Sequence, residues 1–393
     1  MTLPGVQSER TCLMSGGVMA LLSLADEYRF PGIAIPEIDD LLYERYASDM
    51  RKWGRRIYYR IRPVIPRPVQ IALRRGFTNV QKKGGFPAWP IEPVLVERAR
   101  ECLKSAVRHS SSGCVYRMST WPDRCRFAFA ITHDVETDAG LRFAPRLAEM
   151  EREMEYCSAW NIVPERYPID WDIVHWLQSR GSEIGVHGLN HDGTLFDSRA
   201  RFSLQVEKIN DYARRWGAVG FRSPSMLRNA EWMRELAFEY DSSFPDTDPY
   251  EPQPGGCCSI WPYPLHHLIE LPLTMPQDHT LFEILQDESI ARWKAKCDWI
   301  EEHSGLVMLN VHPDYMAKEG RLELYREFLL HMKRKKGMWH PLPRQVARWW
   351  RDRHSSTLLR NGNHFEIRGP AASRGNVLRV WLEGEDLREE IVE

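Results

Sequence analysis

Short apolar runs alternate with longer amphipathic segments from about Arg126 to His354. The apolar runs have the length of buried strands, and the segments between them repeat apolar residues at helical spacing. Seven strands are predicted, at Phe127–Ile131, Ala159–Val163, Glu183–Val186, Ala218–Phe221, Tyr240–Phe244, Leu268–Leu271 and Leu306–Val311. Six helices are predicted between or after them, at Arg146–Tyr156, Trp171–Arg180, Arg199–Trp216, Glu231–Glu239, Ile290–His303 and Arg321–Lys336. Repeated strand–helix units predict an α/β protein whose parallel sheet is closed into a barrel or is open and doubly wound.

The segments on either side of this region lack the alternation. Residues 1–120 are predicted to be an N-terminal extension that packs on the main domain, which covers residues 121–354 and ends in a helix begun by Pro343. Residues 355–393 are predicted to be a small C-terminal tail. Within it, His364–Ile367 and Val377–Leu382 look like two strands around a loop rich in Gly, Pro and Ser, so a β-hairpin is one arrangement of this tail.

Composition excludes several classes of protein. The 393 residues are 43% hydrophobic and 27% charged, which is ordinary for a globular protein and excludes collagen-like, coiled-coil and disordered chains. The net charge of -1 argues against a globally basic nucleic-acid binder. No window is apolar enough for a membrane span, and Val18–Leu24 reads as a buried helix and not as a signal peptide. The eight cysteines form no CxxC pair, so we expect reduced thiols and a cytoplasmic location.

One stretch departs from the neutral balance. From Arg51 to Arg75 there are nine basic residues and no acidic residue, with aromatic and aliphatic residues among them. The stretch would suit an acidic partner, such as a phosphate-rich substrate or a membrane surface. It would equally suit an arm that packs its aromatic rings on the main domain and leaves its arginines in water, and we favour this second interpretation.

Polar residues able to do chemistry follow the predicted strands directly. The first strand leads into Thr132-His133-Asp134-Val135-Glu136, the third into His187-Gly188-Leu189-Asn190-His191, the fourth into Arg222-Ser223-Pro224, and the seventh into His312. Because the carboxyl ends of parallel strands meet at one edge, where α/β proteins build their sites, we expect these residues to converge.

The two histidines of the third strand end can be metal ligands or simply hydrogen-bonded side chains, and the spacing alone does not decide between the two. A nearby carboxylate favours the metal, because two imidazoles and one carboxylate with open positions form a catalytic metal arrangement. Asp134 and Glu136 are two apart at a strand end and can face one pocket. One would bind the metal and the other act as general base, unless both simply cap the following helix.

In this order, the four motifs resemble those of the polysaccharide deacetylases of carbohydrate esterase family 4, over about Arg124 to Trp350. The resemblance implies a distorted (β/α)7 barrel, which agrees with the seven strands predicted from the apolar runs. It also implies one divalent metal ion, with zinc first and cobalt, nickel or iron as alternatives. The family's usual Asp-Asp pair is Asp134-Val135 here. Because valine has no ligand atom, the acid-Val-acid variant makes Glu136 the metal-binding acid.

The same resemblance assigns roles to the residues. Glu136, His187 and His191 would bind the metal. Asp134 would be the catalytic base, kept ionised and oriented by Arg222, and His312 would give a proton to the leaving nitrogen. Asp314 is a candidate to orient His312, and Asp241, Tyr250 and Trp261 are candidates to line the substrate groove.

The function implied is metal-dependent hydrolysis of an N-acetyl group on a sugar of a polysaccharide, oligosaccharide or glycan precursor. The partner would be this carbohydrate, with no nucleic acid. Two alternatives stay open: a hydrolase of a small non-sugar amide on the same fold, and a non-catalytic binding protein that kept the barrel.

Overall fold

The computed structural model describes residues 36–46, 67–81, 85–361 and 364–392. The predicted helix at Val18–Leu24 and residues 51–66 of the basic stretch lie outside these ranges. Seven parallel strands form the centre of the molecule: β2 (Phe127–Val135), β3 (Ser158–Ile162), β4 (Glu183–His187), β5 (Gly220–Arg222), β6 (Tyr240–Asp241), β8 (Leu268–Glu270) and β9 (Leu306–Val311). They are the seven strands predicted from the apolar runs, with ends shifted by a few residues.

The order of these strands is that of a barrel. Neighbours pair in parallel from β2 through β3, β4, β5 and β6 to β8, and β9 pairs in parallel with the other edge of β2. The segment after β8 closes the gap to β9, because the Met275 amide donates to the Met308 carbonyl (3.1 Å) and the Thr274 hydroxyl to the Leu306 carbonyl (2.5 Å). The prediction of a (β/α)7 barrel is confirmed, and the open doubly wound sheet is excluded.

Two short strands extend this sheet outside the ring. β10 (Met338–Trp339) pairs in parallel with the start of β2, and β7 (Tyr263–Leu265) pairs antiparallel with β8. All nine residues of β2 are buried, which is expected of a strand with a neighbour on each edge and helices outside.

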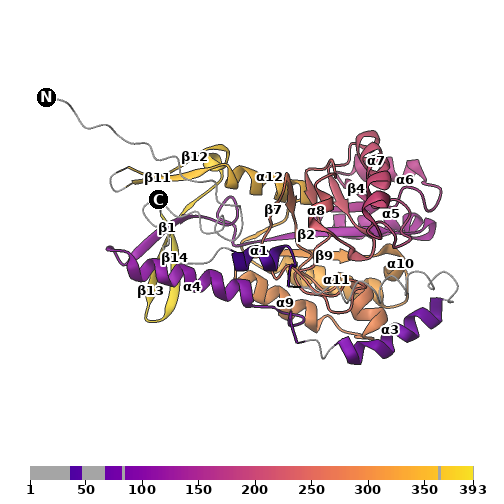
Figure 1. The fold of residues 1–393 in the computed structure, drawn as a ribbon, viewed down its shortest axis with the longest axis horizontal. Helices are drawn as coiled ribbons and strands as arrows, with labels where there is room; N and C mark the ends of the chain where they lie inside the picture. Colours follow the sequence, from indigo (N-terminus) through magenta and orange to yellow (C-terminus); the bar gives the residue numbers. More distant parts are fainter. Residues whose placement is uncertain (1–35, 47–66, 82–84, 362–363, 393) are drawn as a thin grey trace.

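Helices cover the outside of the barrel (Figure 1). They are α5 (Asp138–Glu153), α6 (Trp171–Ser179), α7 (Arg199–Trp216), α8 (Ala230–Met233), α9 (Ala291–Glu302), α10 (Pro313–Met316), α11 (Arg321–Lys333) and α12 (Pro343–His354). Short 3-10 turns at Pro224–Met226 (η5) and Pro370–Ser373 (η7) and a π-helical turn at His279–Ile284 (η6) join them.

Capping residues and turns explain where the observed helix ends agree with the predicted ends and where they differ. α7 matches its prediction because Ser198 caps its start and Gly217, in the left-handed conformation, ends it. α5 begins eight residues earlier than predicted: Thr137 caps it, and Pro145 lies inside it instead of before it. α8 is shorter than predicted. The amides of Glu235 and Leu236 after it bond in turns, and the Ala237 amide donates to the side chain of Asn210 on α7 (2.8 Å).

The described parts of the flanking segments add three helices and two small sheets. The helices are α1 (Pro36–Leu42), α3 (Arg67–Gln81) and α4 (Val94–His109). The strands are β1 (Cys114–Met118), β11 (Thr357–Asn361), β12 (His364–Arg368), β13 (Val377–Glu383) and β14 (Asp386–Val392). None of the described helices could cross a membrane, judged by length and apolar content.

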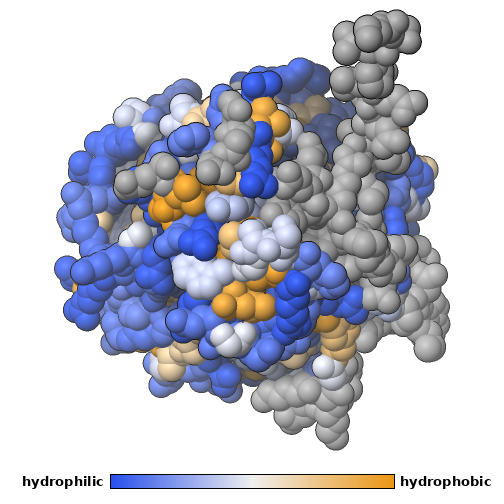
Figure 2. All heavy atoms as spheres, turned by 90° about the vertical axis from the view of Figure 1, so that its left-hand side faces the viewer, coloured by the Kyte–Doolittle hydropathy of each residue, from blue (hydrophilic) through white to orange (hydrophobic). Residues whose placement is uncertain are grey.

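The tail differs from the single hairpin considered for it. β12 pairs with β11, while β13 pairs on one side with β1 and on the other with β14, all antiparallel. The two strands predicted in the tail therefore exist but do not pair with each other. The molecular surface at the end that carries β1, β13 and β14 is mostly hydrophilic where it is described, with apolar residues in small patches (Figure 2).

Candidate metal centre

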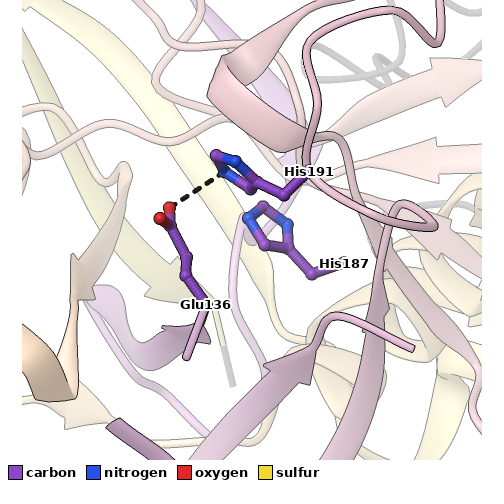
Figure 3. Close-up of side chains that lie close together, drawn as sticks. All are labelled: Glu136, His187 and His191. Atoms are coloured by element: carbon purple, nitrogen blue, oxygen red, sulfur yellow. Dashed lines mark ion pairs between the residues drawn. The ribbon is translucent and has the colours of Figure 1, made fainter. Parts of the chain in front are cut away.

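The side chains that follow β2 and β4 meet at the carboxyl end of the barrel (Figure 3). Glu136 comes directly after β2, His187 is the last residue of β4, and His191 follows on the loop after it. Each offers one ligand atom, and these atoms lie within 4.8 Å of one another. A separation of this order lets one small cation contact all three after small adjustments of the side chains.

The loop between the two histidines depends on a glycine. Gly188 has φ of +62°, and a Cβ there would lie 2.4 Å from Cδ and Cγ of Pro224. A larger residue would therefore meet both backbone strain and the proline of the neighbouring strand end. The loop packs tightly enough to hold His187 and His191 on one side, with their ring centroids 5.1 Å apart.

His187 has one ring nitrogen, Nε2, available as a metal ligand. Its Nδ1 hydrogen-bonds the carbonyl oxygen of Arg222 at 3.0 Å, which leaves Nε2 as the free lone pair. Burial lowers the pKa of His187 to about 4 against the raising effect of Asp134, so the ring is neutral at physiological pH. A neutral imidazole whose other nitrogen is held by a carbonyl is the usual form of a histidine ligand.

His191 and Glu136 supply the strongest sign that a cation belongs here. His191 Nε2 lies 2.9 Å from Glu136 Oε1, yet neither ring nitrogen of this buried histidine makes a hydrogen bond to any described residue. Burial would raise the pKa of Glu136, but its interactions with His191 first, and with His312 next, hold it well below the usual value. The donor set of two imidazoles and one ionised carboxylate fits a divalent metal such as zinc.

Asp134 stands beside this group but is held by other partners. Its two oxygens accept hydrogen bonds from the side-chain amides of Asn161 and Asn310, each at 2.9 Å. Burial by itself would raise the pKa of Asp134. The charge of Arg222, helped by the neighbouring histidines, outweighs burial and lowers this pKa to about 2. Asp134 is therefore ionised and fixed in orientation, while Glu136 is the carboxylate that faces the two candidate histidine ligands.

Arg222 acts on Asp134 through charge and not through a hydrogen bond. Its Nη1 lies 3.7 Å from Asp134 Oδ2, and its Nη2 donates to the hydroxyls of Ser242 (2.8 Å) and Thr132 (3.1 Å). The guanidinium has no exposed surface. Arg222 was expected both to orient Asp134 and to keep it ionised. In the structure the side-chain amides of Asn161 and Asn310 orient Asp134, and the charge of Arg222 lowers its pKa.

His312 faces the candidate ligands from the far side of the site. Its Nε2 lies 3.7 Å from Glu136 Oε1, and its Nδ1 and backbone N–H each bond the Asp278 carboxylate at 2.7 Å. Burial would lower the pKa of His312, but the Asp278 carboxylate outweighs it and raises the pKa to about 10. His312 is thus a protonated imidazolium at neutral pH.

Four other expectations for single residues need correction. Asp314 does not contact His312; it accepts a hydrogen bond from the Thr137 hydroxyl at 2.5 Å. Trp261 lies at the opposite end of the barrel, where its indole N–H donates to Ser304, just before β9 (3.1 Å). Tyr250 is 4% exposed and packs edge-to-face on another ring. Asp241 is fully buried and accepts from Ser243 instead of facing a groove.

Three polar partners of the site were missed in the sequence. Asn161 and Asn310 each carried a signal: a polar amide inside an otherwise apolar strand beside the strand end. Asp278 carried none, because it lies after Pro276 in a segment with no predicted element. Gln277 next to it accepts from Asn310 (3.1 Å) and donates to Glu251 (3.1 Å), which ties the segment before η6 to the same network.

The fold and the site together define a (β/α)7 barrel with a candidate mononuclear metal centre at its carboxyl end. No protein-family model matches the sequence, nor does any curated protein. Solved structures do match. One is a protein from Mycobacterium smegmatis assigned to the polysaccharide deacetylases, with 20% identity and a TM-score of 0.49, covering 63% of this chain and 97% of that one.

Two further matches have different described activities. An allantoinase has 16% identity and a TM-score of 0.47, with 60% of this chain and 93% of that chain covered. A chitin deacetylase from the fungus Colletotrichum lindemuthianum has 12% identity and a TM-score of 0.37, with 57% and 89% covered. At these identities and scores the likeness concerns the fold, so we rest the functional argument on the residues of this chain.

Proposed function

We propose that the chain is a metal-dependent hydrolase that removes the acetyl group from an N-acetylated sugar, in a polymer, oligosaccharide or activated precursor, and releases acetate. The observation that carries the proposal is that the acids and histidines of the site fall into two sets with different partners. Glu136, His187 and His191 form one group whose ligand atoms lie together, while Asp134 and His312 stand beside it with other partners.

Three residues would hold the metal ion, Glu136, His187 and His191. When bound there, a divalent metal would supply a Lewis acid for the acetyl carbonyl and lower the pKa of a water molecule. His187 keeps Nε2 available because Nδ1 is held by the Arg222 carbonyl. We propose zinc first, with cobalt, nickel or iron as alternatives.

Asp134 is suited to accept the proton of the attacking water. A carboxylate has about four lone-pair positions, and the amides of Asn161 and Asn310 occupy two of them. The remaining positions can take a proton while the amides keep the side chain in place. The buried charge of Arg222 keeps the carboxylate ionised before the reaction begins.

His312 is suited to protonate the leaving nitrogen. An amine is a poor leaving group unless it gains a proton, and a positioned general acid contributes about 10²–10⁴-fold to such a step. The Asp278 carboxylate holds the imidazolium by Nδ1, so the proton on Nε2 points to the side where Glu136 lies. Acid and base therefore stand on two separate residues.

The metal site is tested by elemental analysis of zinc-loaded and desalted protein. We expect about one metal ion per chain in the wild type and almost none in the H187A/H191A double variant. The matched control is H266A/H267A, since these adjacent histidines bond the carbonyl oxygens of Ala230 and Leu236 far from the site. Wild-type protein that retains no metal would contradict the proposal and favour the non-catalytic binding protein.

The substrate is tested by acetate release from a panel of chitooligosaccharides, peptidoglycan fragments, activated N-acetyl sugars and small non-sugar amides. We expect metal-loaded protein to act on an N-acetylated sugar. Release of product from a small non-sugar amide alone would replace the sugar by the alternative substrate class while leaving the metal site standing. A cytoplasmic location for this step stays a prediction.

A further inference from the structure

Helix α3 is attached to the rest of the molecule in an unusual way. Three polar side chains from it reach the described loops: Arg74 Nη2 donates to the Tyr250 carbonyl (2.9 Å), Arg75 Nε to the Glu283 carbonyl (2.9 Å), and Gln81 Nε2 to the Pro249 carbonyl (2.8 Å). Thr78, on the same side of the helix, is buried. The polar face of α3 therefore points inward.

The opposite face of α3 is apolar and exposed. Val69 and Leu73 are 47% and 56% exposed, and Ala72 and Gly76 are exposed as well. Spacings of three and four residues place these four positions in one stripe. At 3.6 residues per turn, roughly 180° separates the centre of this stripe from that of the face bearing Arg74, Arg75 and Thr78. An amphipathic helix normally buries its apolar residues, so the exposure of this stripe on α3 is unusual.

The charge of the sequence on either side of α3 indicates what would cover the stripe. Between Met50 and Ile91 the sequence holds eleven of the 53 basic residues and none of the 54 acidic residues of the chain. A positively charged segment around an apolar helix face is the composition of a helix that lies on an anionic bilayer. A nucleic acid or acidic polysaccharide would use the charge but not the apolar stripe.

The position of α3 connects this surface with the metal centre. α3 contacts η6, and Asp278, which caps η6, bonds His312. It also contacts the loop of Tyr250, next to Glu251, whose carboxylate accepts from Gln277. Figure 1 shows α3 at the outer edge of the molecule, at the end where α10 follows His312.

We propose that the exposed stripe of α3, formed by Val69, Ala72, Leu73 and Gly76, docks on the surface of an anionic lipid bilayer. The helix would lie between the bilayer and the rim of the barrel, with its polar side on the protein and its apolar side in the headgroup region. Docking in this way brings the mouth of the barrel to the membrane surface. This inference does not depend on the proposed hydrolysis, because it concerns binding without substrate.

The test is co-sedimentation of the full chain with vesicles of phosphatidylcholine alone and of phosphatidylcholine with phosphatidylglycerol at three to one. We expect binding to the anionic vesicles, at least tenfold weaker binding to the zwitterionic ones, and weakening by 0.5 M salt. The V69Q/L73Q variant should lose at least tenfold in apparent affinity for anionic vesicles. The control is L204Q on α7, whose leucine is 71% exposed, and it should bind as the wild type does.

A second variant reports insertion directly. In L73W the new indole should shift its fluorescence emission to shorter wavelength on anionic vesicles and remain unshifted without them. A far-ultraviolet circular dichroism spectrum like that of the wild type shows that both variants are folded.

Four results would overturn the proposal. These are no binding of wild type to anionic vesicles, equal binding of V69Q/L73Q, conversion of a wild-type dimer to a monomer by V69Q/L73Q, and a lower melting temperature of V69Q/L73Q with unchanged vesicle binding. Equal binding of V69Q/L73Q would indicate a purely electrostatic site for polyanions. Conversion of a dimer to a monomer would indicate that a second copy of the chain covers the stripe. A lower melting temperature with unchanged vesicle binding would indicate that a segment of the same chain covers it.

Discussion

Two aspartates are candidates for the partner of His312, and only one of them bonds it. Asp314 is two residues away in sequence but bonds Thr137, whereas Asp278 is 34 residues away and bonds both the ring and the backbone of His312. Proximity in sequence was the wrong guide because α10 begins at Pro313 and carries Asp314 around its first turn. The backbone of η6 brings Asp278 to the ring instead.

The different partners of Asp278 and Asp314 make D278N and D314N a matched pair of variants. D278N removes the charge that keeps His312 protonated, so we expect kcat for acetate release to fall about 100-fold. D314N should change kcat by less than about threefold. Equal losses in both variants would show that the Asp278 contact has no special role.

The pH profile separates this effect from a general loss of packing. With the pKa of His312 raised to about 10, activity that needs its imidazolium persists into alkaline solution in the wild type. In D278N the largest raising effect on the His312 pKa is removed and burial is opposed only by the charges of Glu136 and Asp134, so the alkaline limb of kcat should move to lower pH by about one unit or more. An unmoved limb would argue against His312 as the proton donor.

At the scale of residues, a position on or beside a strand end was a better guide to the site than residue type. Asn161 and Asn310 stand out inside apolar strands and could have been predicted as partners of a strand-end acid. Tyr250 and Trp261 were chosen as aromatic residues in or beside a long segment rich in Pro and Gly. In the structure Tyr250 packs on Trp89, and Trp261 lies at the far end of the barrel. Residue type without a position on a strand end was therefore a poor guide.

At the scale of elements, the strands were predictable because each is a short apolar run between turns. The register that brings β2 and β4 ends together follows from their parallel pairing through β3. By contrast, the closing contact between Thr274–Met275 and β9 has no sequence pattern, because it is made by one hydroxyl and two backbone amides. α4 was missed because no strand alternates with it.

The loop of the two histidines allows a test with an internal control. Gly188 and Gly217 share φ of +62°, but a Cβ at Gly188 would meet Pro224, and one at Gly217 meets nothing within 4 Å. G217A should cost about 1 kcal/mol of unfolding free energy through backbone strain alone. G188A should cost more than this and retain well under one metal ion per chain.

Urea unfolding and elemental analysis of both variants measure the two effects. Full metal content in G188A would mean that the loop tolerates displacement and that its glycine does not position the histidines.

At the scale of the whole molecule, a single carboxyl group joins three distant segments. Glu183, at the start of β4, accepts from the Tyr240 hydroxyl of β6 (2.8 Å) and from the Arg344 amide of α12 (3.1 Å). Burial raises the pKa of Glu183 from 4.5 to about 7 despite these bonds. In the unfolded chain the group ionises near its ordinary value.

This shift predicts a pH dependence of stability. Because the folded protein holds the proton more tightly, the contribution of Glu183 is complete below about pH 4.5 and is lost as the pH rises through 7. Between pH 5 and 8 the wild type should lose about 2.5 kcal/mol more of unfolding free energy than E183Q. Urea titrations of both proteins at the two pH values measure this difference, and parallel losses would contradict the raised pKa.

The pairing of β1 with β13 has a consequence for how the chain is made. Val115 and Val380 lie opposite each other in this pair and are both buried, so neither strand is covered without the other. β13 begins 259 residues after β1 ends. At about 5–20 residues per second, β1 waits roughly ten to fifty seconds on the ribosome for its partner. During that interval its edge is open to other strands, so a nascent chain stalled within the barrel presents a site for chaperone binding or aggregation.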